Sequence, residues 1–407
     1  MDAVRALLLA ALVPPLACGG GGGGGGGDEA PPDARAPDTF DRGAMVAHLA
    51  EAVFLATYES FSARAAELVP AVDSYCAALG GDAEAEAIAR AAAQDGWRAA
   101  MLEWQAAEVM LVGPAAMDDR ALRDVIYSWP VISTCAVDRE VLDHYRDPAA
   151  YDIGERLSNR RGLPALERVL FAADLEHTCP AGGPPDGWDE LADAERLAAR
   201  CGYAQAAAAD LATQAAAVAT GWRADGGDYV GELARAGESG SSLASAQQAA
   251  NLISDAMFYL DTETKDMKLA EPAGIADNSC GAVEEPCPDE LESRASGQSK
   301  ENVIRNLEAF RMIYLGDRPP DSGGLGFDDF LLGVGASDVA EDMGGRIDAA
   351  IAATADIPGT LEEALVADRE AVVNAHAQVR AVTDALKSQF LTVLGLEIPD
   401  GAAGDND

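Results

Sequence analysis

The sequence predicts an all-α protein made of two helical-bundle domains. Of its 407 residues, 49% are hydrophobic but only 6% are aromatic, because much of the apolar content is alanine. Alanine is the best helix former and a poor strand former. Apolar residues recur every three or four positions over long segments, whereas no alternating β-branched run is bounded by turn residues. A chain of this length is typical of two domains of roughly 100–200 residues each.

The first residues predict an export signal. Arg5 supplies a positive charge, and the apolar segment 6–13 is shorter than the roughly 20 residues that a membrane-spanning helix needs. The sequence Leu-Ala-Cys that ends at Cys18 resembles the end of a bacterial lipobox. We therefore expect a signal peptide at 1–17 and a lipidated Cys18 that begins a Gly/Pro-rich tether at 18–43. An ordinary cleaved signal peptide is the alternative.

Beyond Cys18, an even number of cysteines in an exported chain predicts disulfides. The six candidates are Cys76, Cys135, Cys179, Cys201, Cys280 and Cys287. Local spacing favours a bond between Cys280 and Cys287. Cys179 would then pair with Cys201 across a Gly/Pro-rich connection, which leaves Cys76 for Cys135. A zinc site is disfavoured, since the chain contains no C-x-x-C pair.

Apolar periodicity predicts a first group of helices in the predicted N-terminal bundle, residues 44–230. The expected helices span 44–78, 83–112, 119–127, 137–145, 162–173 and 189–223. Gly and Pro residues after the first two mark their ends. We expect Pro70 to kink or divide the first helix and Gly202 to interrupt the last.

A second group of helices forms the predicted C-terminal bundle, residues 231–397. The expected helices span 242–269, 300–315, 337–355 and 360–394. The acidic tail at 398–407 is expected to be disordered. The sequence RVLFAAD at 168–174 resembles RMIYLGD at 311–317, which raises the alternative that the two bundles are a duplicated pair.

The charge of the chain restricts its ligands. Its formal net charge is -40, which excludes nucleic acid as a partner because phosphate binding needs surface Lys and Arg. A cation is the more natural ligand. The sequence contains no G-x-S-x-G motif and no phosphate-binding G-K-[ST] loop, and its four His residues are scattered. Nucleophilic catalysis therefore finds no support.

Carboxylates on helix faces are the remaining candidates for chemistry. These are chiefly Glu103, Glu108 and Glu167, and Glu108 shares a helix face with Trp97 and Trp104. A buried carboxylate must be paired, hydrogen-bonded or coordinated. The favoured interpretation is an ion pair with Arg161, Arg168 or another arginine. The alternative is a metal site that includes Glu108 and Glu167.

Several segments together resemble the imelysin family, which includes imelysin-like bacterial lipoproteins. They include WRAAMLEWQAAEVMLVGP at 97–114, YSWP at 127–130, RGLPALERVLF at 161–171, DTETKDMKLAEPAG at 261–274 and SKENVIRNLEAFRMIYLGD at 299–317. The resemblance implies two helical bundles in the periplasm or on the outer membrane, often linked to iron uptake. It also implies a metal-binding G-x-H-x-x-E motif that was once associated with peptidase activity. Gly162 and Glu167 match this motif, but Pro164 replaces its His.

This combination predicts a non-catalytic lipoprotein of the cell envelope that binds a ligand or partner in metal acquisition, with iron favoured. It would face the periplasm or the cell surface of the outer membrane. A divalent or ferric metal ion is the expected cofactor, if there is one. Its expected partners are metal-uptake proteins of the outer membrane or periplasm, and the membrane itself through the lipid anchor. The alternatives are a metallopeptidase that uses Glu167 and a structural or interaction module without metal.

Overall fold

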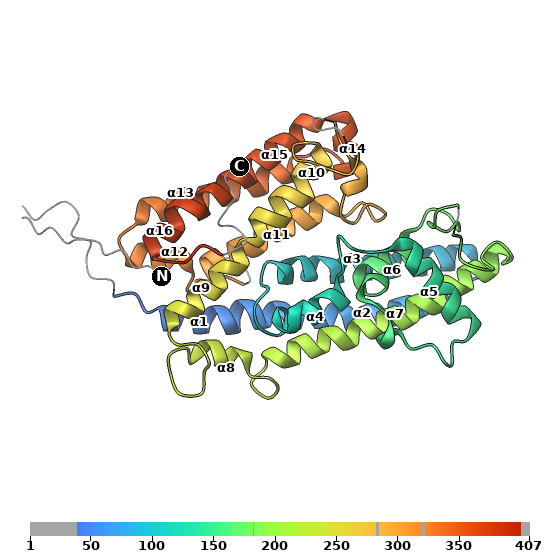
Figure 1. Ribbon diagram of the computed structural model, residues 1–407, viewed down its shortest axis with the longest axis horizontal. Coiled ribbons are helices and arrows are strands. Elements are labelled where there is room, and N and C mark those ends of the chain that lie inside the picture. The colour runs from blue at the N-terminus through green and yellow to red at the C-terminus, as the bar shows by residue number, and fades with distance from the viewer. Residues whose placement is uncertain (1–38, 182, 282–284, 319–321, 400–407) are drawn as a thin grey trace, which may run out of the picture. The chain divides into compact units, whose positions relative to one another are not determined.

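The computed structural model describes residues 39–399, except 182, 282–284 and 319–321. The predicted signal peptide, the predicted lipidation site Cys18 and nearly all of the acidic tail lie outside the described residues. Within the described part every regular element is helical and no strand occurs (Figure 1). The all-α prediction is therefore confirmed. None of the described helices combines the length and the apolar character that crossing a membrane requires.

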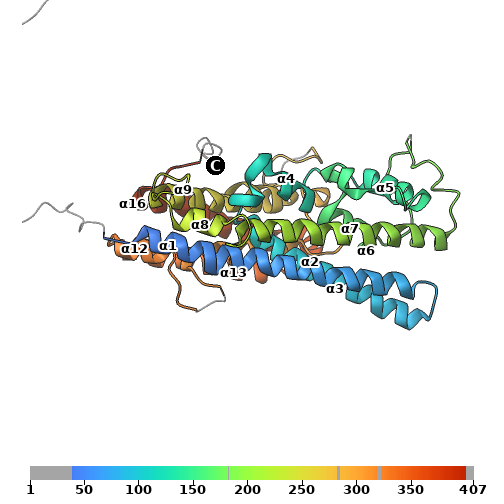
Figure 2. The same ribbon diagram turned by 90° about the horizontal axis from the view of Figure 1, so that it is seen from below.

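Three long helices organise the first half of the chain. The helices of this half are α1 Arg42–His48, α2 Ala56–Ala78, α3 Ala83–Glu108, α4 Met117–Ile126, α5 Thr134–Arg146, α6 Gly162–Phe171, α7 Asp193–Trp222 and α8 Tyr229–Ala234. Helix α2 packs along α3 and α7, and α6 lies against α3 and α7 (Figures 1 and 2). Their shared core contains large aromatic side chains, such as Phe61 and Trp104, whose ring centroids lie 4.9 Å apart.

The expected division at Pro70 and the expected interruption at Gly202 are wrong, whereas a kink at Pro70 stays a prediction. Helix α2 continues through Pro70, and α7 continues through Gly202. The irregularity instead comes earlier, because Leu49–Leu55 is π-helical and joins α1 to α2. Helix α8 spans residues 230 and 231, where the sequence analysis places the boundary between the two bundles.

The second half is also helical. Its elements are α9 Ala246–Met257, a π-helical segment Leu260–Ala270, α10 Glu271–Ala273, α11 Ser299–Leu315, α12 Phe327–Gly333, α13 Ser337–Ala355, α14 Leu361–Ala367, α15 Arg369–Ala385, a π-helical segment Leu386–Phe390 and α16 Leu391–Leu394. Helix α13 packs between α11 and α15. The single helix expected at 360–394 is divided, since Asp368 has non-helical backbone angles and caps α15.

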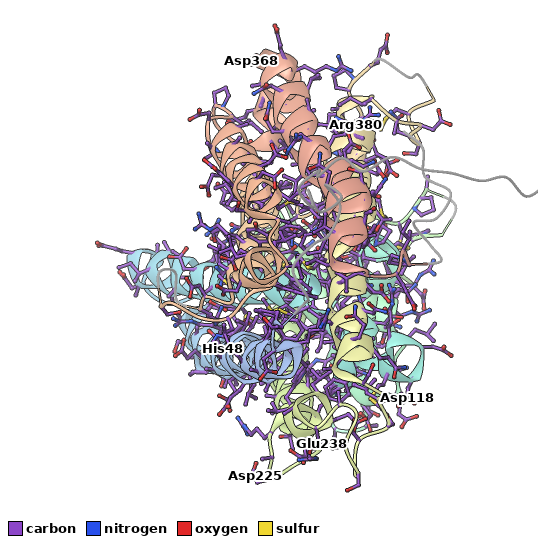
Figure 3. The ribbon with its side chains drawn as sticks, turned by 90° about the vertical axis from the view of Figure 1, so that its left-hand side faces the viewer. His48, Asp118, Asp225, Glu238, Asp368 and Arg380 are labelled. Atoms are coloured by element: carbon purple, nitrogen blue, oxygen red, sulfur yellow. A yellow bond between two sulfur atoms is a disulfide. The ribbon has the colours of Figure 1, made fainter. Side chains whose placement is uncertain are left out.

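The two halves contact each other chiefly through α3 and α11. A second contact links α1 to the end of α11, where Nε2 of His48 (labelled in Figure 3) lies 2.7 Å from the carbonyl oxygen of Gly316. The described residues belong to one compact unit. The division into bundles at 44–230 and 231–397 stays a prediction.

All six candidate cysteines form disulfides, but two expected pairings are wrong. The bonds are Cys76–Cys201, Cys135–Cys179 and Cys280–Cys287. Only the pair that is close in sequence was predicted correctly. The other two depend on helix packing, because α2 lies along α7 and brings Cys76 to Cys201.

Candidate functional site

A cavity of about 490 Å³ lies where the start of α6 meets segments from both halves of the chain. It contains two of the three motif positions, Pro164 and Glu167. The lining residues are Tyr127, Trp129, Ile132, Thr134, Pro164, Glu167, Arg168, Thr178, Leu291, Ser293, Arg294, Ala295 and Glu362. Most of the exposed wall is apolar, as is typical of small-molecule sites, although four charged residues, Glu167, Arg168, Arg294 and Glu362, also line it.

The backbone at the start of α6 requires glycine. Gly162 has a φ of +76°, which side chains rarely adopt. A Cβ at this position would collide with the carbonyl oxygen of Ile126 and lie 2.6 Å from that of Val125. Pro164 follows in the first turn, where its missing N–H leaves no helical bond unmade. The predicted helix start is therefore confirmed.

Helix α3 holds α6 in place against the cavity. The indole Nε1 of Trp97 donates to the carbonyl oxygen of Leu163 over 2.9 Å, and the side-chain amide of Gln94 donates to the carbonyl oxygen of Leu170 over 2.8 Å. Both bonds fix the rotation of α6. As a result, the side chain of Glu167 lines the cavity.

Glu167 joins α6 to the segment that follows residue 292. Its Oε1 accepts hydrogen bonds from the backbone N–H of Ser296 over 2.9 Å and from the Ser296 hydroxyl over 2.8 Å. Among the described residues, no Lys, Arg or His forms an ion pair with this carboxylate. Burial raises the pKa of Glu167 to about 7, although the hydrogen bonds from Ser296 act to lower it.

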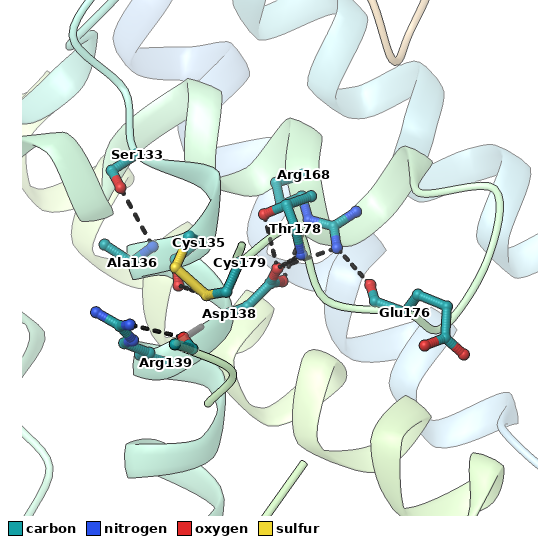
Figure 4. The surroundings of a disulfide bond; sticks show 10 residues. Ser133, Cys135, Ala136, Asp138, Arg139, Arg168, Glu176, Thr178 and Cys179 are labelled. Carbon is teal, nitrogen blue, oxygen red and sulfur yellow. Dashed lines mark hydrogen bonds and ion pairs between the residues drawn. A yellow bond between two sulfur atoms is a disulfide. The ribbon is translucent and has the colours of Figure 1, made fainter. Parts of the chain in front are cut away.

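One wall of the cavity is built around Asp138. This carboxylate accepts two bonds from the Arg168 guanidinium, at 3.2 and 3.1 Å, and two from the backbone N–H and hydroxyl of Thr178, at 2.7 and 2.9 Å (Figure 4). The disulfide Cys135–Cys179 lies next to it. The lining residues Thr134 and Thr178 directly precede the two cysteines, so the disulfide fixes this wall.

A buried polar cluster lies behind Tyr127. Glu292 accepts hydrogen bonds from the Tyr127 hydroxyl, from Gln105 over 3.0 Å and from Asn302 over 2.9 Å, and it pairs with Lys268 at 3.0 Å. Burial, followed by the charge of Glu292, raises the pKa of Tyr127, so this hydroxyl keeps its proton and donates a hydrogen bond to Glu292. The cluster combines residues from both halves and leaves Glu292 fully bonded.

Glu108 is fully buried and paired with arginine, as the favoured interpretation expected. The partner is Arg123, which binds both carboxylate oxygens at 3.1 and 3.0 Å, and the Tyr259 hydroxyl donates to the same carboxylate over 3.2 Å. Arg161 and Arg168, named as candidate partners, bind Asp210 and Asp138 instead. Glu103, the third candidate, pairs with Arg305 and Arg318.

The residues around Glu167 do not fit a metal ion. Pro164 offers no ligand where the family motif has an imidazole. Glu108 does not line the cavity, and its oxygens are occupied by Arg123 and Tyr259. Across the described part of the chain, no three His, Cys, Asp or Glu side chains come together in a group that could hold a metal.

Sequence reasoning missed most of the buried cluster. Lys268 lies within the segment 261–274 that carries part of the family resemblance, but its partner Glu292 follows a different loop. The sequence offered no clear signal for this pair, because Lys268 and Glu292 each stand among several other charged residues.

Comparisons with known proteins identify the family to which this fold and this motif belong. The fold and the G-x-P-x-x-E version of the motif at the cavity define a helical-bundle protein of the imelysin type. The sequence profile described as Imelysin matches residues 54–389, so the chain belongs to the imelysin family. The chain is 26% identical over 346 residues to iron-regulated protein A of Synechococcus elongatus, a match that covers 84% of each protein.

Two solved structures share the fold. The imelysin-like protein from Psychrobacter arcticum has a TM-score of 0.65 and 18% sequence identity, covering 88% of this chain and 96% of its own. A candidate iron-regulated protein A precursor from Parabacteroides distasonis has a TM-score of 0.69 and 19% identity, covering 89% of this chain and 97% of its own.

Proposed function

We propose that this chain is a non-catalytic protein of the cell envelope that binds a ligand in metal acquisition, with iron the favoured metal. The cavity beside Glu167 carries the proposal. It lies at the family motif, yet Pro164 has replaced the imidazole and the wall is largely apolar. These features suit the binding of a small molecule better than coordination of a bare ion.

The iron-related part of the proposal rests on relatives. Iron-regulated protein A of Synechococcus elongatus and the Parabacteroides distasonis protein both have names that refer to iron regulation. The envelope location is supported by the sequence that ends at Cys18 and by the three disulfides, which persist in oxidising compartments. Metal-uptake proteins of the outer membrane or periplasm are the proposed partners.

Hydrolysis is the weaker alternative. A metallopeptidase needs a metal that activates water, held by about three protein ligands. Next to Glu167 the chain instead supplies a hydroxyl and a backbone amide of Ser296, both of which donate to the carboxylate. A purely structural role would leave unexplained a largely apolar cavity whose Glu167 carboxyl group has no ion pair within the described part of the chain.

The test is growth under iron limitation of a strain that encodes this chain. We expect deletion of the gene to slow growth in the presence of an iron chelator, and added iron to restore it. An Ala295→Trp variant, which fills the mouth of the cavity, should fail to rescue the deletion. Ala87→Trp, at an exposed position of α3 outside the cavity, should rescue it. Growth of the deletion strain at the normal rate at every iron level would contradict the proposal.

A further inference from the structure

We infer that the cavity beside Glu167 takes an organic cation, namely an ammonium group carried on an apolar body. This inference rests on the proposed binding function and specifies the chemistry of its ligand. It depends on three properties of the cavity: the charges in its wall, its aromatic surface and the small number of groups that could bind a metal ion.

The wall charges leave one carboxyl group without a counter-charge. Arg168 is neutralised by Asp138, which binds it through two hydrogen bonds. Arg294 is shared between Glu362 at 3.0 Å and Asp289. Glu167 has hydrogen-bond donors but no ion pair among the described residues. A cationic ligand would supply the missing charge, since a desolvated carboxylate is costly until it is paired.

Aromatic and aliphatic side chains make up much of the rest of the wall. Tyr127, Trp129, Ile132, Pro164 and Leu291 contribute this apolar surface. Aromatic faces attract cations, most strongly when water is excluded. The protein already uses this preference, because Nζ of Lys268 lies 5.6 Å from the ring centroid of Trp129. A ligand with an ammonium group and a hydrocarbon portion would match both kinds of surface.

Competing ligands fit less well. An anion would meet the uncompensated carboxyl of Glu167 and the strongly negative field of a chain with a net charge of -40. A metal ion would find one available carboxylate and the ring of Pro164. The volume of about 490 Å³ holds a small molecule or one arm of a larger one.

Calorimetric titration of the full chain at about pH 8 tests the inference, with phenethylamine as the cationic probe. Its neutral counterpart is 2-phenylethanol, and its anionic counterpart is 3-phenylpropanoate. We expect one saturable site for the amine, binding weaker by about tenfold or more for the alcohol, and no binding of the anion. Equal affinities for amine and alcohol would overturn the inference.

A matched pair of variants assigns the effect to one carboxyl group. Glu167→Gln keeps the size of the side chain and removes the charge, so amine affinity should fall about tenfold or more. Glu67→Gln removes an exposed carboxylate of α2 and should leave affinity unchanged. Amine affinity of the unmodified chain should also fall as pH decreases through about 7, and this trend should vanish in Glu167→Gln. Unchanged affinity in Glu167→Gln would contradict the assignment.

The ammonium group could belong to a free amine or to one arm of an iron chelate. A titration with the iron(III) complex of a hydroxamate chelator that carries a free amine, and with its N-acetylated form, separates these sources. Tighter binding of the amine-bearing complex than of phenethylamine indicates the chelate, and weaker binding indicates a free amine. The two proposals fail separately: loss of growth under iron limitation without amine binding rejects this inference alone, and amine binding without a growth defect rejects only the role in iron acquisition.

Discussion

Ser296 donates two hydrogen bonds to one oxygen of Glu167, although 129 residues separate them in the sequence. The carboxyl group at the last position of the family motif is thus an acceptor that ties α6 to the second half of the chain. This role needs no metal. Among the described residues that line the cavity, Glu167 is the charged group without an ion pair, and it lies at the contact between the two halves, so stability and the proposed ligand binding depend on the same group.

The first prediction concerns pH. Burial raises the pKa of Glu167 to about 7 from an ordinary value of 4.5, so the folded state holds a proton that the unfolded state releases. The stabilisation from this group is fully present below about pH 4.5 and is lost as pH rises through 7. Glu167→Gln should therefore be more stable than the unmodified chain at pH 8, by about 1–3 kcal/mol, and should match it near pH 5.

Denaturant unfolding of both proteins between pH 5 and 8 measures this difference. Glu67→Gln serves as the control, because its exposed carboxyl should change stability by less than about 0.5 kcal/mol at every pH. A difference between Glu167→Gln and the unmodified chain that does not vary with pH would show that Glu167 is not desolvated.

The second prediction concerns the turn before α6. Gly162→Ala should destabilise the chain by about 2–4 kcal/mol, because the positive φ and the carbonyl oxygens of Val125 and Ile126 leave no room for a Cβ. Gly345→Ala in α13 is the control, since nothing lies within 4 Å of its added Cβ. That variant should be neutral or stabilised by up to about 1 kcal/mol. Thermal or denaturant unfolding of the two variants distinguishes these outcomes.

The third prediction contrasts a buried and an exposed ion pair. Glu108→Gln leaves Arg123, whose side chain is only 12% exposed, with the half-exposed Asp124 at 3.2 Å as its remaining charged partner, and should cost about 3–5 kcal/mol. Glu59→Gln breaks the pair with Arg223, in which both side chains are more than 40% exposed, and should cost less than about 1 kcal/mol. Similar losses in the two variants would mean that Arg123 finds another partner or reaches water.

The fourth prediction concerns the disulfides, whose stabilisation grows with the length of chain they close. Replacing both cysteines by serine should cost most for Cys76–Cys201, separated by 125 residues, and least for Cys280–Cys287, separated by 7. Chain-entropy estimates are about 5 and 2 kcal/mol, with about 4 kcal/mol for Cys135–Cys179. Replacement of Cys135 and Cys179 should also weaken phenethylamine binding strongly, because the lining residues Thr134 and Thr178 lie beside this disulfide. The other two replacements should not. Unfolding and calorimetry on the three variants check the order.

The fifth prediction concerns metals. The described lining residues include no imidazole, and the second carboxylate, that of Glu362, is paired with Arg294. Iron, zinc and copper should therefore give no saturable heat on titration, and EDTA should leave the melting temperature unchanged. Saturable binding that disappears in Glu167→Ala would instead support a metal site. Proteolysis of an unfolded substrate that a chelator abolishes would support the peptidase alternative.

The sequence was sufficient for the fold class and for much of the helix pattern. Helix formation depends largely on local alanine content and apolar periodicity. The helix at 337–355 was therefore predicted with the same ends that α13 shows. The division expected at Pro70 was wrong because α2 continues through this residue, packed along α3 and α7.

The site was predictable only in part. Gly162, Pro164 and Glu167 lie within six positions of the sequence, so a short motif identifies them. The partner of Glu108 could be assigned to the class of arginines but not to Arg123, and the cluster around Glu292 could not be assembled at all. These pairs form only because α3, α11 and the segment after residue 287 pack against one another. Residue spacing in the sequence does not predict this packing.

The bonds of Glu292 have a consequence for motion. Its partners Gln105 and Tyr127 precede residue 230, whereas Lys268 and Asn302 follow it, and all of them are desolvated. Sliding or hinging of one half over the other would break several charge-assisted bonds at once, with no water to replace them. We therefore expect a ligand to enter by small adjustments at the rim of the cavity, near Arg294 and Ala295, while the helices behind it keep a fixed register.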